Sequence, residues 1–512
     1  MFWCQLALSL PAPKRQNAFL APSGESQNMI SSAYLKHDAF IDGNWSASAS
    51  GKSFAVYNPA DGTKIADVAD CGTADAERAI AAADRAFGSW SALTANARAE
   101  KLMAWHALML AHENELADIL TAEMGKPLAE AVGEIRYGAS YLEWYAEEAK
   151  RVYGDVIPHA SGDVRTVVVK QPIGVCAAIT PWNFPNAMLM RKVAAALAAG
   201  CTMVAKPAED TPLSALAIAA LAEQAGIPPG VLNIVPTSGA AEVGEALTSS
   251  PIVRKLSFTG STEVGRLLLE QCAPTIKKAS LELGGNAPFI IFDDADIDAA
   301  MEGLMASKFR NAGQTCVCAN RIFVHRSVHS EVAQKLVECV KRMKVGPGED
   351  AGNDIGPLIN IGAVEKVEKL VASARNEGAQ ILIGGGRHET GGLFFEPTIL
   401  DNISNDMKIA RSEIFGPVAT LIPFDSEAEV IALANDTPYG LAAYFYSRDI
   451  GRVWRVGEAL EYGMVGINQG IVSSAAAPFG GVKQSGLGRE GSKYGLEDYL
   501  EIKYLCLGGI GQ

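Results

Sequence analysis

The stretch from Gly174 to Val235 constrains the fold of this chain more than any other part of the sequence. Short apolar segments bounded by Gly and Pro alternate here with long Ala-rich helical patterns. The predicted strands are residues 175–179, 202–206 and 231–235, and the predicted helices are residues 183–199 and 212–224, the second closed by Gly226. Two consecutive crossovers between parallel strands follow, which is the unit of a dinucleotide-binding sheet.

The same alternation begins at Phe40 and appears again near Ala287, where residues 289–292 predict a strand and residues 297–309 a helix. Two α/β lobes are therefore expected. A strand-like alternation at residues 165–169 belongs to neither lobe, and such an arm often pairs with another subunit because an exposed sheet edge otherwise invites uncontrolled pairing.

These patterns predict a Rossmann-type cofactor domain, an α/β catalytic domain and a β arm for oligomerisation. The expected limits are 29–152 with 171–282 for the cofactor domain, 283–490 for the catalytic domain, and 153–170 with 491–512 for the arm. Residues 1–28 are interpreted as a disordered extension or a misassigned start. A targeting segment is the alternative, although the only nearby basic residues, Lys14 and Arg15, follow the apolar run instead of preceding it.

Composition excludes several classes of protein. A chain of 512 residues with 48% hydrophobic residues buries large cores, and its net charge of -14 repels a phosphate backbone. The nine cysteines lack the CxxC spacing of a structural zinc site, so we expect free thiols in a reducing compartment and no metal. The longest apolar stretch, residues 193–205, is shorter than the roughly 20 residues that cross a bilayer. A cytoplasmic protein without nucleic-acid or membrane partners is expected.

Three local motifs carry chemistry. Cys316 lies among small residues just beyond a helical pattern, although a single Cys is more often a small buried hydrophobe. Glu282 stands between leucines and before two glycines, and apolar surroundings raise the pKa of a carboxyl group towards the range of a general base. Asn183 follows the first predicted strand in Thr180-Pro181-Trp182-Asn183-Phe184-Pro185, where a helix cap is the simpler interpretation.

Together, and in this order, the three motifs resemble the aldehyde dehydrogenase superfamily over about residues 38 to 505. The resemblance implies an aldehyde dehydrogenase-like α/β fold, with Cys316 as nucleophile, Glu282 as general base and Asn183 as oxyanion donor together with the Cys316 N–H. It also implies a thiohemiacetal, hydride transfer to a nicotinamide and hydrolysis of a thioester. The presence of Glu282 argues against the relatives that transfer the acyl group to coenzyme A, because those lack this carboxylate.

The resemblance also implies a cofactor site. Lys206 and Glu209 are expected on the adenosine ribose, Glu413 on the nicotinamide ribose, and Gly260 with Ser261 at a phosphate beside a helix N-terminus. The same motifs contribute Thr180, Pro181, Trp182, Gly265 and Phe415. Because the Glu209 carboxylate would repel a 2′-phosphate, NAD is predicted to be preferred over NADP.

Within the superfamily, the sequence most resembles succinate-semialdehyde dehydrogenases. That resemblance implies that Arg191, Arg310 and Ser474 bind the distal carboxylate of a small semialdehyde, since guanidinium groups bind carboxylates in bidentate fashion. Glutarate semialdehyde, one methylene longer, stays open as the substrate. Cys318 is either a packing residue or the partner of Cys316 in a regulatory disulfide.

Two other functions explain these residues less well. A thiol esterase that needs no cofactor would leave Lys206, Glu209 and Glu413 without a role, and a non-catalytic scaffold would have no use for a nucleophile, a base and an oxyanion donor together. The arm and a strand-like segment at residues 499–504 predict a homodimer or a homotetramer.

Overall fold

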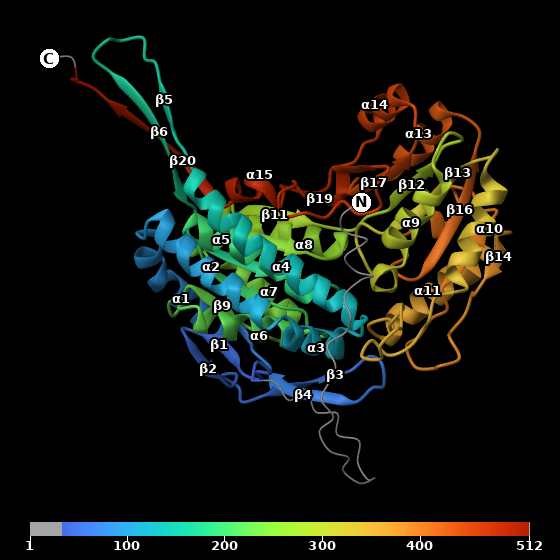
Figure 1. Cartoon of the computed structure of the whole chain (residues 1–512). Helices are drawn as coiled ribbons and strands as arrows, with labels where there is room; N and C mark the ends of the chain where they lie inside the picture. The colour runs from blue at the N-terminus through green and yellow to red at the C-terminus, as the bar shows by residue number, and fades with distance from the viewer. Residues whose placement is uncertain (1–32, 511–512) are drawn as a thin grey trace, which may run out of the picture.

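The computed structural model describes residues 33–510 and contains two large sheets, each covered by helices (Figure 1). The first sheet contains the predicted crossovers, because β7, β8 and β9 pair in parallel in that order. Its strands, in spatial order, are β19 (Gly486–Leu487), β11 (Lys278–Glu282), β10 (Val253–Thr259), β7 (Val175–Ile179), β8 (Thr202–Lys206), β9 (Leu232–Ile234), β1 (Ala39–Ile41) and β2 (Asn44–Ser46). The expected dinucleotide-binding unit is therefore present.

The helices of this lobe cover both faces of the sheet. They are α1 (Thr73–Ser91), α2 (Ala95–Ala111), α3 (Glu113–Met124), α4 (Leu128–Glu148), α5 (Pro185–Ala199), α6 (Pro212–Gln224), α7 (Ala240–Ser249) and α8 (Thr262–Cys272). Every residue of α5 is buried, since α2 and α4 cover it from outside. The sequence placed its start at residue 183, two residues early. Phe184 has an extended φ of -139° because the residue before a proline avoids the helical region.

The second sheet forms the second lobe. In spatial order its strands are β14 (Gln380–Ile383), β15 (Thr398–Asp401), β16 (Val418–Phe424), β13 (Ala319–His325), β12 (Ala287–Ile291), β17 (Ala442–Tyr446) and β18 (Met464–Ile467). Its helices are α9 (Ile297–Lys308), α10 (His329–Val340), α11 (Ile361–Asn376), α12 (Lys408–Arg411), α13 (Glu427–Asn435) and α14 (Ile450–Ala459). The strand and helix predicted at 289–292 and 297–309 fall on β12 and α9. A separate apolar core of Phe, Ile, Leu and Val side chains holds the lobe together.

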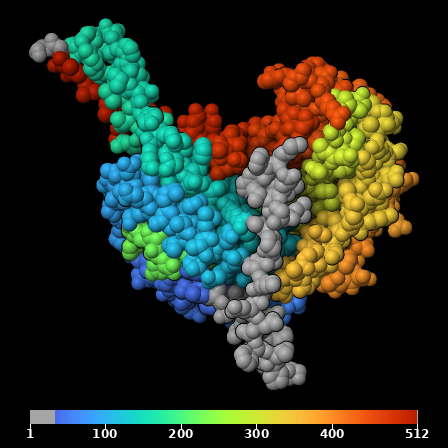
Figure 2. All heavy atoms as spheres, viewed as in Figure 1, coloured from blue at the N-terminus to red at the C-terminus, as the bar shows by residue number. Residues whose placement is uncertain are grey.

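A third sheet projects from the body, as both views show (Figure 1, Figure 2). It consists of β5 (Asp155–Ile157), β6 (Arg165–Pro172) and β20 (Leu500–Leu507), with β6 paired antiparallel to both neighbours. Val156 and Ile502 are 75% and 73% exposed on it. The strands predicted at 165–169 and 499–504 are therefore present, and they belong to one arm.

Among residues 33–510 the remaining elements are one β hairpin, one short helix and four short 3₁₀ helices. A hairpin of β3 (Ser53–Tyr57) and β4 (Lys64–Ala69) lies outside the large sheets, and α15 (Ser492–Glu497) packs on α5 and α4. Residues 486–487, which the sequence assigned to the catalytic lobe, pair with β11 of the first sheet, so the chain returns to that sheet before it enters the arm. The prediction for residues 1–28 lies outside the described residues. Between residues 33 and 510 no helix combines the length and apolar character required to cross a bilayer.

Candidate active site

A cavity of about 260 Å³ lies where the two lobes meet. One wall is formed by residues that follow β7, β10 and β11, and the other by the segment between α9 and β13 and by later loops. The first-lobe wall includes Tyr137, Pro181, Trp182, Asn183, Phe184, Met188, Arg191, Thr259, Gly260, Ser261, Leu283 and Gly284. The second-lobe wall includes Arg310, Thr315, Cys316, Val317, Lys366, Glu413, Phe415, Ser473 and Phe479. Most of the residues singled out in the sequence therefore line one space.

The backbone before Cys316 is unusually bent. Asn311 and Ala312 both have a φ of 53°, in the left-handed region that non-glycine residues rarely adopt. Hydrogen bonds hold this shape: the Asn311 Nδ2 donates to the Asn183 carbonyl at 2.9 Å, and the Gln314 Nε2 donates to the Asn311 carbonyl at 3.2 Å. The bend turns the chain from a 3₁₀ turn towards β13 and leaves Cys316 on the cavity wall.

The Cys316 thiol is protonated in this environment. Burial raises its pKa to about 12, and the nearby carboxyl groups of Glu413 and Glu282 add to the rise, whereas Arg191 and Arg310 oppose it. Since the thiolate is the nucleophile, a reaction at Cys316 requires a proton acceptor and local stabilisation of negative charge.

Asn183 is placed to stabilise that charge. Its Nδ2 donates one hydrogen bond to the Gln314 carbonyl at 2.9 Å, and because an amide nitrogen carries two hydrogens, the second remains for the cavity. A buried ion pair fixes its backbone: the Lys126 Nζ contacts Glu134 and donates to the Asn183 carbonyl at 2.8 Å. Asn183 therefore lines the same cavity as Cys316, within a turn that hydrogen bonds from Lys126 and Asn311 hold in place.

Glu282, at the end of β11, is 2% exposed, and neither of its carboxyl oxygens has a hydrogen-bond partner within residues 33–510. Burial raises its pKa well above the usual range, and Glu490 adds to the rise. The desolvation expected from the sequence is thus present. The two glycines after it allow the loop to pass close to the nucleophile, since a Cβ at Gly285 would overlap the Cys316 carbonyl oxygen.

Most of the residues expected to hold a dinucleotide lie at the carboxyl ends of strands of the first sheet, and Glu413 and Phe415 face them from the second lobe. Ser261 caps α8, and the Glu413 carboxylate accepts a hydrogen bond from the Gly285 N–H at 3.0 Å beside the cavity. The Lys206 Nζ lies 3.4 Å from the Glu209 carboxylate at the end of β8. A helix N-terminus with acidic groups at both ends of this crevice fits an extended dinucleotide.

Some predicted cofactor residues do not line the cavity. Thr180, Lys206, Glu209 and Gly265 are outside its wall. A Cβ at Gly265 would overlap the Leu283 side chain, so this glycine serves the close packing of α8 on the sheet.

The arginines differ in their surroundings. Arg191 is 2% exposed and already bonded, with its Nη1 3.1 Å from Glu490. Arg310 has a buried Nε without a hydrogen-bond partner among the described residues, which leaves this donor for a ligand.

Ser474 is exposed and is absent from the cavity wall, where its neighbour Ser473 stands instead. A loop with no regular pattern carries both serines, so local sequence could not fix which one faces inward. Cys318 is also outside the wall, with its Sγ 3.2 Å from the Lys308 Nζ.

Several wall residues were not singled out from the sequence, among them Tyr137, Met188, Lys366, Ser473 and Phe479. Tyr137 and Lys366 are carried by amphipathic helices, α4 and α11, whose pattern only distinguishes an inner from an outer face. No local motif marks them as cavity residues.

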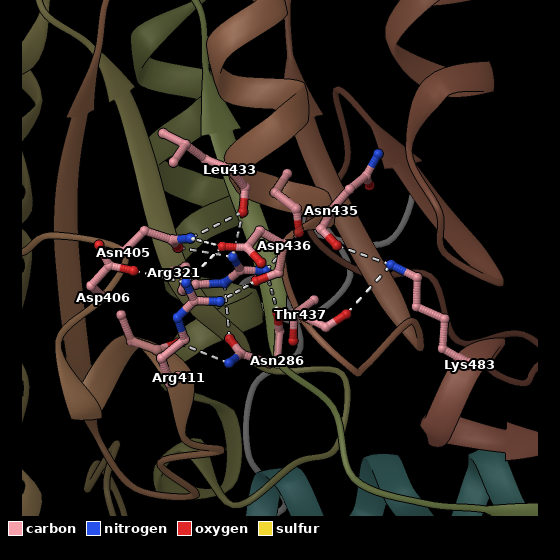
Figure 3. A network of polar contacts seen from close by, with 12 residues as sticks. Asn286, Arg321, Asn405, Asp406, Arg411, Leu433, Asn435, Asp436, Thr437 and Lys483 are labelled. Carbon is pink, nitrogen blue, oxygen red and sulfur yellow. Dashed lines mark hydrogen bonds and ion pairs between the residues drawn. The ribbon is translucent and has the colours of Figure 1, made fainter.

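A buried arginine connects the segments that carry the site (Figure 3). The Arg321 guanidinium donates to the Asn286 side chain at 3.1 Å and to the Leu433 and Ala434 carbonyls at 2.8 Å. Asn286 donates in turn to the Ala410 carbonyl at 2.8 Å. The strands that follow Glu282 and Cys316 are thereby fixed relative to the loop that presents Glu413.

Comparison with known proteins agrees with this geometry. Residues 45–505 match the model of the aldehyde dehydrogenase family. The chain is 60% identical over 474 residues to succinate-semialdehyde dehydrogenase [NADP(+)] of Escherichia coli (strain K12), covering 93% of this chain and 98% of that one. A 3-sulfolactaldehyde dehydrogenase of Pseudomonas putida is 60% identical over 476 residues, with the same coverage. The solved structure of succinate-semialdehyde dehydrogenase from Burkholderia pseudomallei superposes with a TM-score of 0.93 at 59% identity, covering 94% of this chain and 100% of that one.

The cavity wall carries a thiol and an amide, and the buried Glu282 carboxyl group lies close enough to Cys316 to affect its pKa without lining the wall. This chain belongs to the aldehyde dehydrogenase family of oxidoreductases. It is accordingly an NAD(P)-dependent enzyme that oxidises an aldehyde.

Proposed function

We propose that this enzyme oxidises succinate semialdehyde to succinate, with Cys316, Glu282 and Asn183 as its catalytic residues. The observation that carries the substrate assignment is Arg310, a cation on the cavity wall with Cys316 whose buried Nε lacks a partner among residues 33–510. An aldehyde with a distal carboxylate satisfies this donor while its carbonyl faces the thiol. Relatives named for succinate semialdehyde support the same assignment.

In the proposed mechanism the Cys316 thiol gives its proton to a water in the cavity, and the sulfur then forms a bond to the aldehyde carbon while the carbonyl oxygen becomes an oxyanion. The Asn183 amide and the Cys316 N–H donate hydrogen bonds to that oxygen. NAD, when bound, supplies the acceptor for the hydride that leaves this carbon. Glu282 then takes a proton from a water whose oxygen attacks the thioester, and the acid leaves as the carbon–sulfur bond breaks.

A second candidate is glutarate semialdehyde, since a glutarate-semialdehyde dehydrogenase of Pseudomonas aeruginosa is 59% identical to this chain. One additional methylene changes discrimination by only about 1–3 kcal/mol. The ratio of kcat/KM for the two semialdehydes decides between them, and a higher value for the longer one would replace the first assignment.

Replacing Arg310 by Ala tests the substrate anchor. We expect kcat/KM for succinate semialdehyde to fall by about 2–5 kcal/mol of transition-state binding, because a buried charge would lose its partner. Butanal, of equal chain length but neutral, should lose much less. Steady-state assays of both aldehydes at 340 nm measure the two losses, and equal losses would make Arg310 a structural residue.

We also propose that NAD is preferred over NADP. Glu209 lies beside Lys206, and the pKa of the neighbouring Asp210 carboxyl group is raised by burial and, to a lesser extent, by the Glu209 carboxylate. Two acidic side chains thus stand where Lys206 is proposed to meet the adenosine ribose, and they disfavour a 2′-phosphate.

The cofactor preference predicts a kcat/KM about 10-fold higher with NAD, because unit charges about 4 Å apart repel by about 1 kcal/mol even in bulk water and a phosphate carries up to two. Glu209→Ser should lower the ratio of kcat/KM with NAD to kcat/KM with NADP, because the value with NADP should rise. Steady-state rates of both enzymes with both cofactors measure this ratio. A higher kcat/KM with NADP in the unaltered enzyme overturns the assignment.

Two further proposals concern the association of subunits and the division of the chain into domains. We propose that the exposed apolar side chains of β5 and β20 are covered by a second subunit in a homodimer or homotetramer. A cytoplasmic location and the domain limits given above stay predictions, except that residues 486–487 belong to the first sheet.

A further inference from the structure

Two tyrosine hydroxyls surround the Arg191 guanidinium on the cavity side. The Arg191 Nε donates to the Tyr141 hydroxyl at 3.1 Å, and the Arg191 Nη2 donates to the Tyr137 hydroxyl at 3.1 Å. The two hydroxyl oxygens are 2.6 Å apart, one turn from each other on α4. Both oxygens therefore accept from the same cation, and one of them also donates to the other.

Burial decides which hydroxyl donates. Tyr141 is 0% exposed, and within the described part of the chain its hydroxyl contacts only Arg191 and Tyr137. If the Tyr137 hydroxyl donated its hydrogen bond to Tyr141, the Tyr141 proton would be buried without an acceptor, which is energetically unfavourable. The opposite direction satisfies both groups, since Tyr137 is only partly buried and lines the cavity.

The ion pairs around Arg191 leave it little capacity for a ligand. Glu490 lies 3.1 Å from its Nη1 and also contacts Lys192, and the Phe479 ring covers the guanidinium at 3.8 Å. Its donors are thus largely engaged inside the protein, although it lines the cavity beside the Tyr137 hydroxyl that it holds.

We propose that Tyr137 is a specificity-determining residue whose hydroxyl, oriented by Tyr141 and Arg191, donates a hydrogen bond to the distal anionic group of the substrate. This inference rests on the proposed function. It assigns the distal group two donors of different kinds, the Arg310 guanidinium and a neutral hydroxyl supported by a cation. Such a pair distinguishes an anionic end from an apolar end by more than charge alone.

The test compares Tyr137→Phe with Tyr145→Phe. The two variants carry the same chemical change on the same helix, and Tyr145 is fully buried outside the cavity wall. Steady-state kcat and KM are measured with NAD for succinate semialdehyde and for butanal, and thermal unfolding reports on the fold. Tyr137→Phe should lower the kcat/KM ratio of succinate semialdehyde to butanal by about 10- to 100-fold, mainly through KM, as loss of a hydrogen bond to a charged group does. Tyr145→Phe should keep the ratio of the unaltered enzyme.

The outcomes separate this inference from the proposed function. If the unaltered enzyme prefers succinate semialdehyde and Tyr137→Phe keeps that preference, the inference is wrong and the proposed function stands. If Tyr137→Phe lowers kcat/KM equally for both aldehydes, Tyr137 is structural and the inference is again wrong. An unaltered enzyme that does not prefer succinate semialdehyde to butanal refutes the proposed function, and the inference with it.

Discussion

Cys316→Ala should reduce NAD-dependent aldehyde oxidation by about 10⁴-fold or more, the largest effect expected of any substitution in this chain. The reason is that hydride transfer in this mechanism starts from a tetrahedral adduct on the sulfur, and an alanine forms no adduct. Absorbance at 340 nm with succinate semialdehyde and NAD measures the loss.

Cys318→Ala is the matched control, because its sulfur lies two residues along the chain but outside the cavity wall and contacts Lys308. It should keep most of the activity. If the Cys316→Ala enzyme oxidises the aldehyde at more than a small fraction of the normal rate, the covalent mechanism is wrong. Ester cleavage without NAD as the main activity of the unaltered enzyme would favour a thiol esterase.

Glu282→Gln should lower kcat by about 10²- to 10⁴-fold, the range that a positioned general base contributes. A single turnover should still produce NADH, because the substitution preserves the size of the side chain and leaves Cys316 in place. The expected time course is a burst close to one NADH per active site followed by a slow steady rate, as the thioester accumulates.

The pH dependence of this step follows from the raised pKa of Glu282. Only the ionised carboxylate accepts a proton from water, and a raised pKa shifts its ionisation towards higher pH. Steady-state kcat of the unaltered enzyme should therefore rise with pH over the range in which Glu282 ionises, and Glu282→Gln should lose that rise. If Glu282→Gln hydrolyses the thioester at the normal rate, the general base is a group other than Glu282.

The sequence predicted the regular parts of the fold well, because a strand of a parallel sheet that is buried on both faces appears in the sequence as a continuous apolar run. The apolar runs at β7 and β8 and the helical pattern of α6 have the predicted limits. The start of α5 was two residues early, since Pro185 forces the preceding residue out of the helical region. Strand order could not be predicted at residues 486–487, where a two-residue strand pairs with β11 through contacts far apart in the chain.

The chemistry of the site was less predictable than its motifs. The motifs brought Cys316 and Asn183 to one cavity, yet the ion pair of Arg191 with Glu490 joins residues 299 positions apart and leaves no local pattern. Tyr137 and Ser473 were missed for a related reason. Helix periodicity and loop composition do not fix which side chain of a segment faces a cavity between two lobes.

The most direct test of the account is to find where the acyl group forms. Glu282→Gln enzyme is mixed with succinate semialdehyde and NAD, quenched in acid and digested, and the peptide that carries Cys316 and Cys318 is fragmented in a mass spectrometer. The account predicts a succinyl group on the Cys316 sulfur, present only when NAD is added. A peptide without an acyl group after the NADH burst, or an acyl group on any other residue, would contradict it.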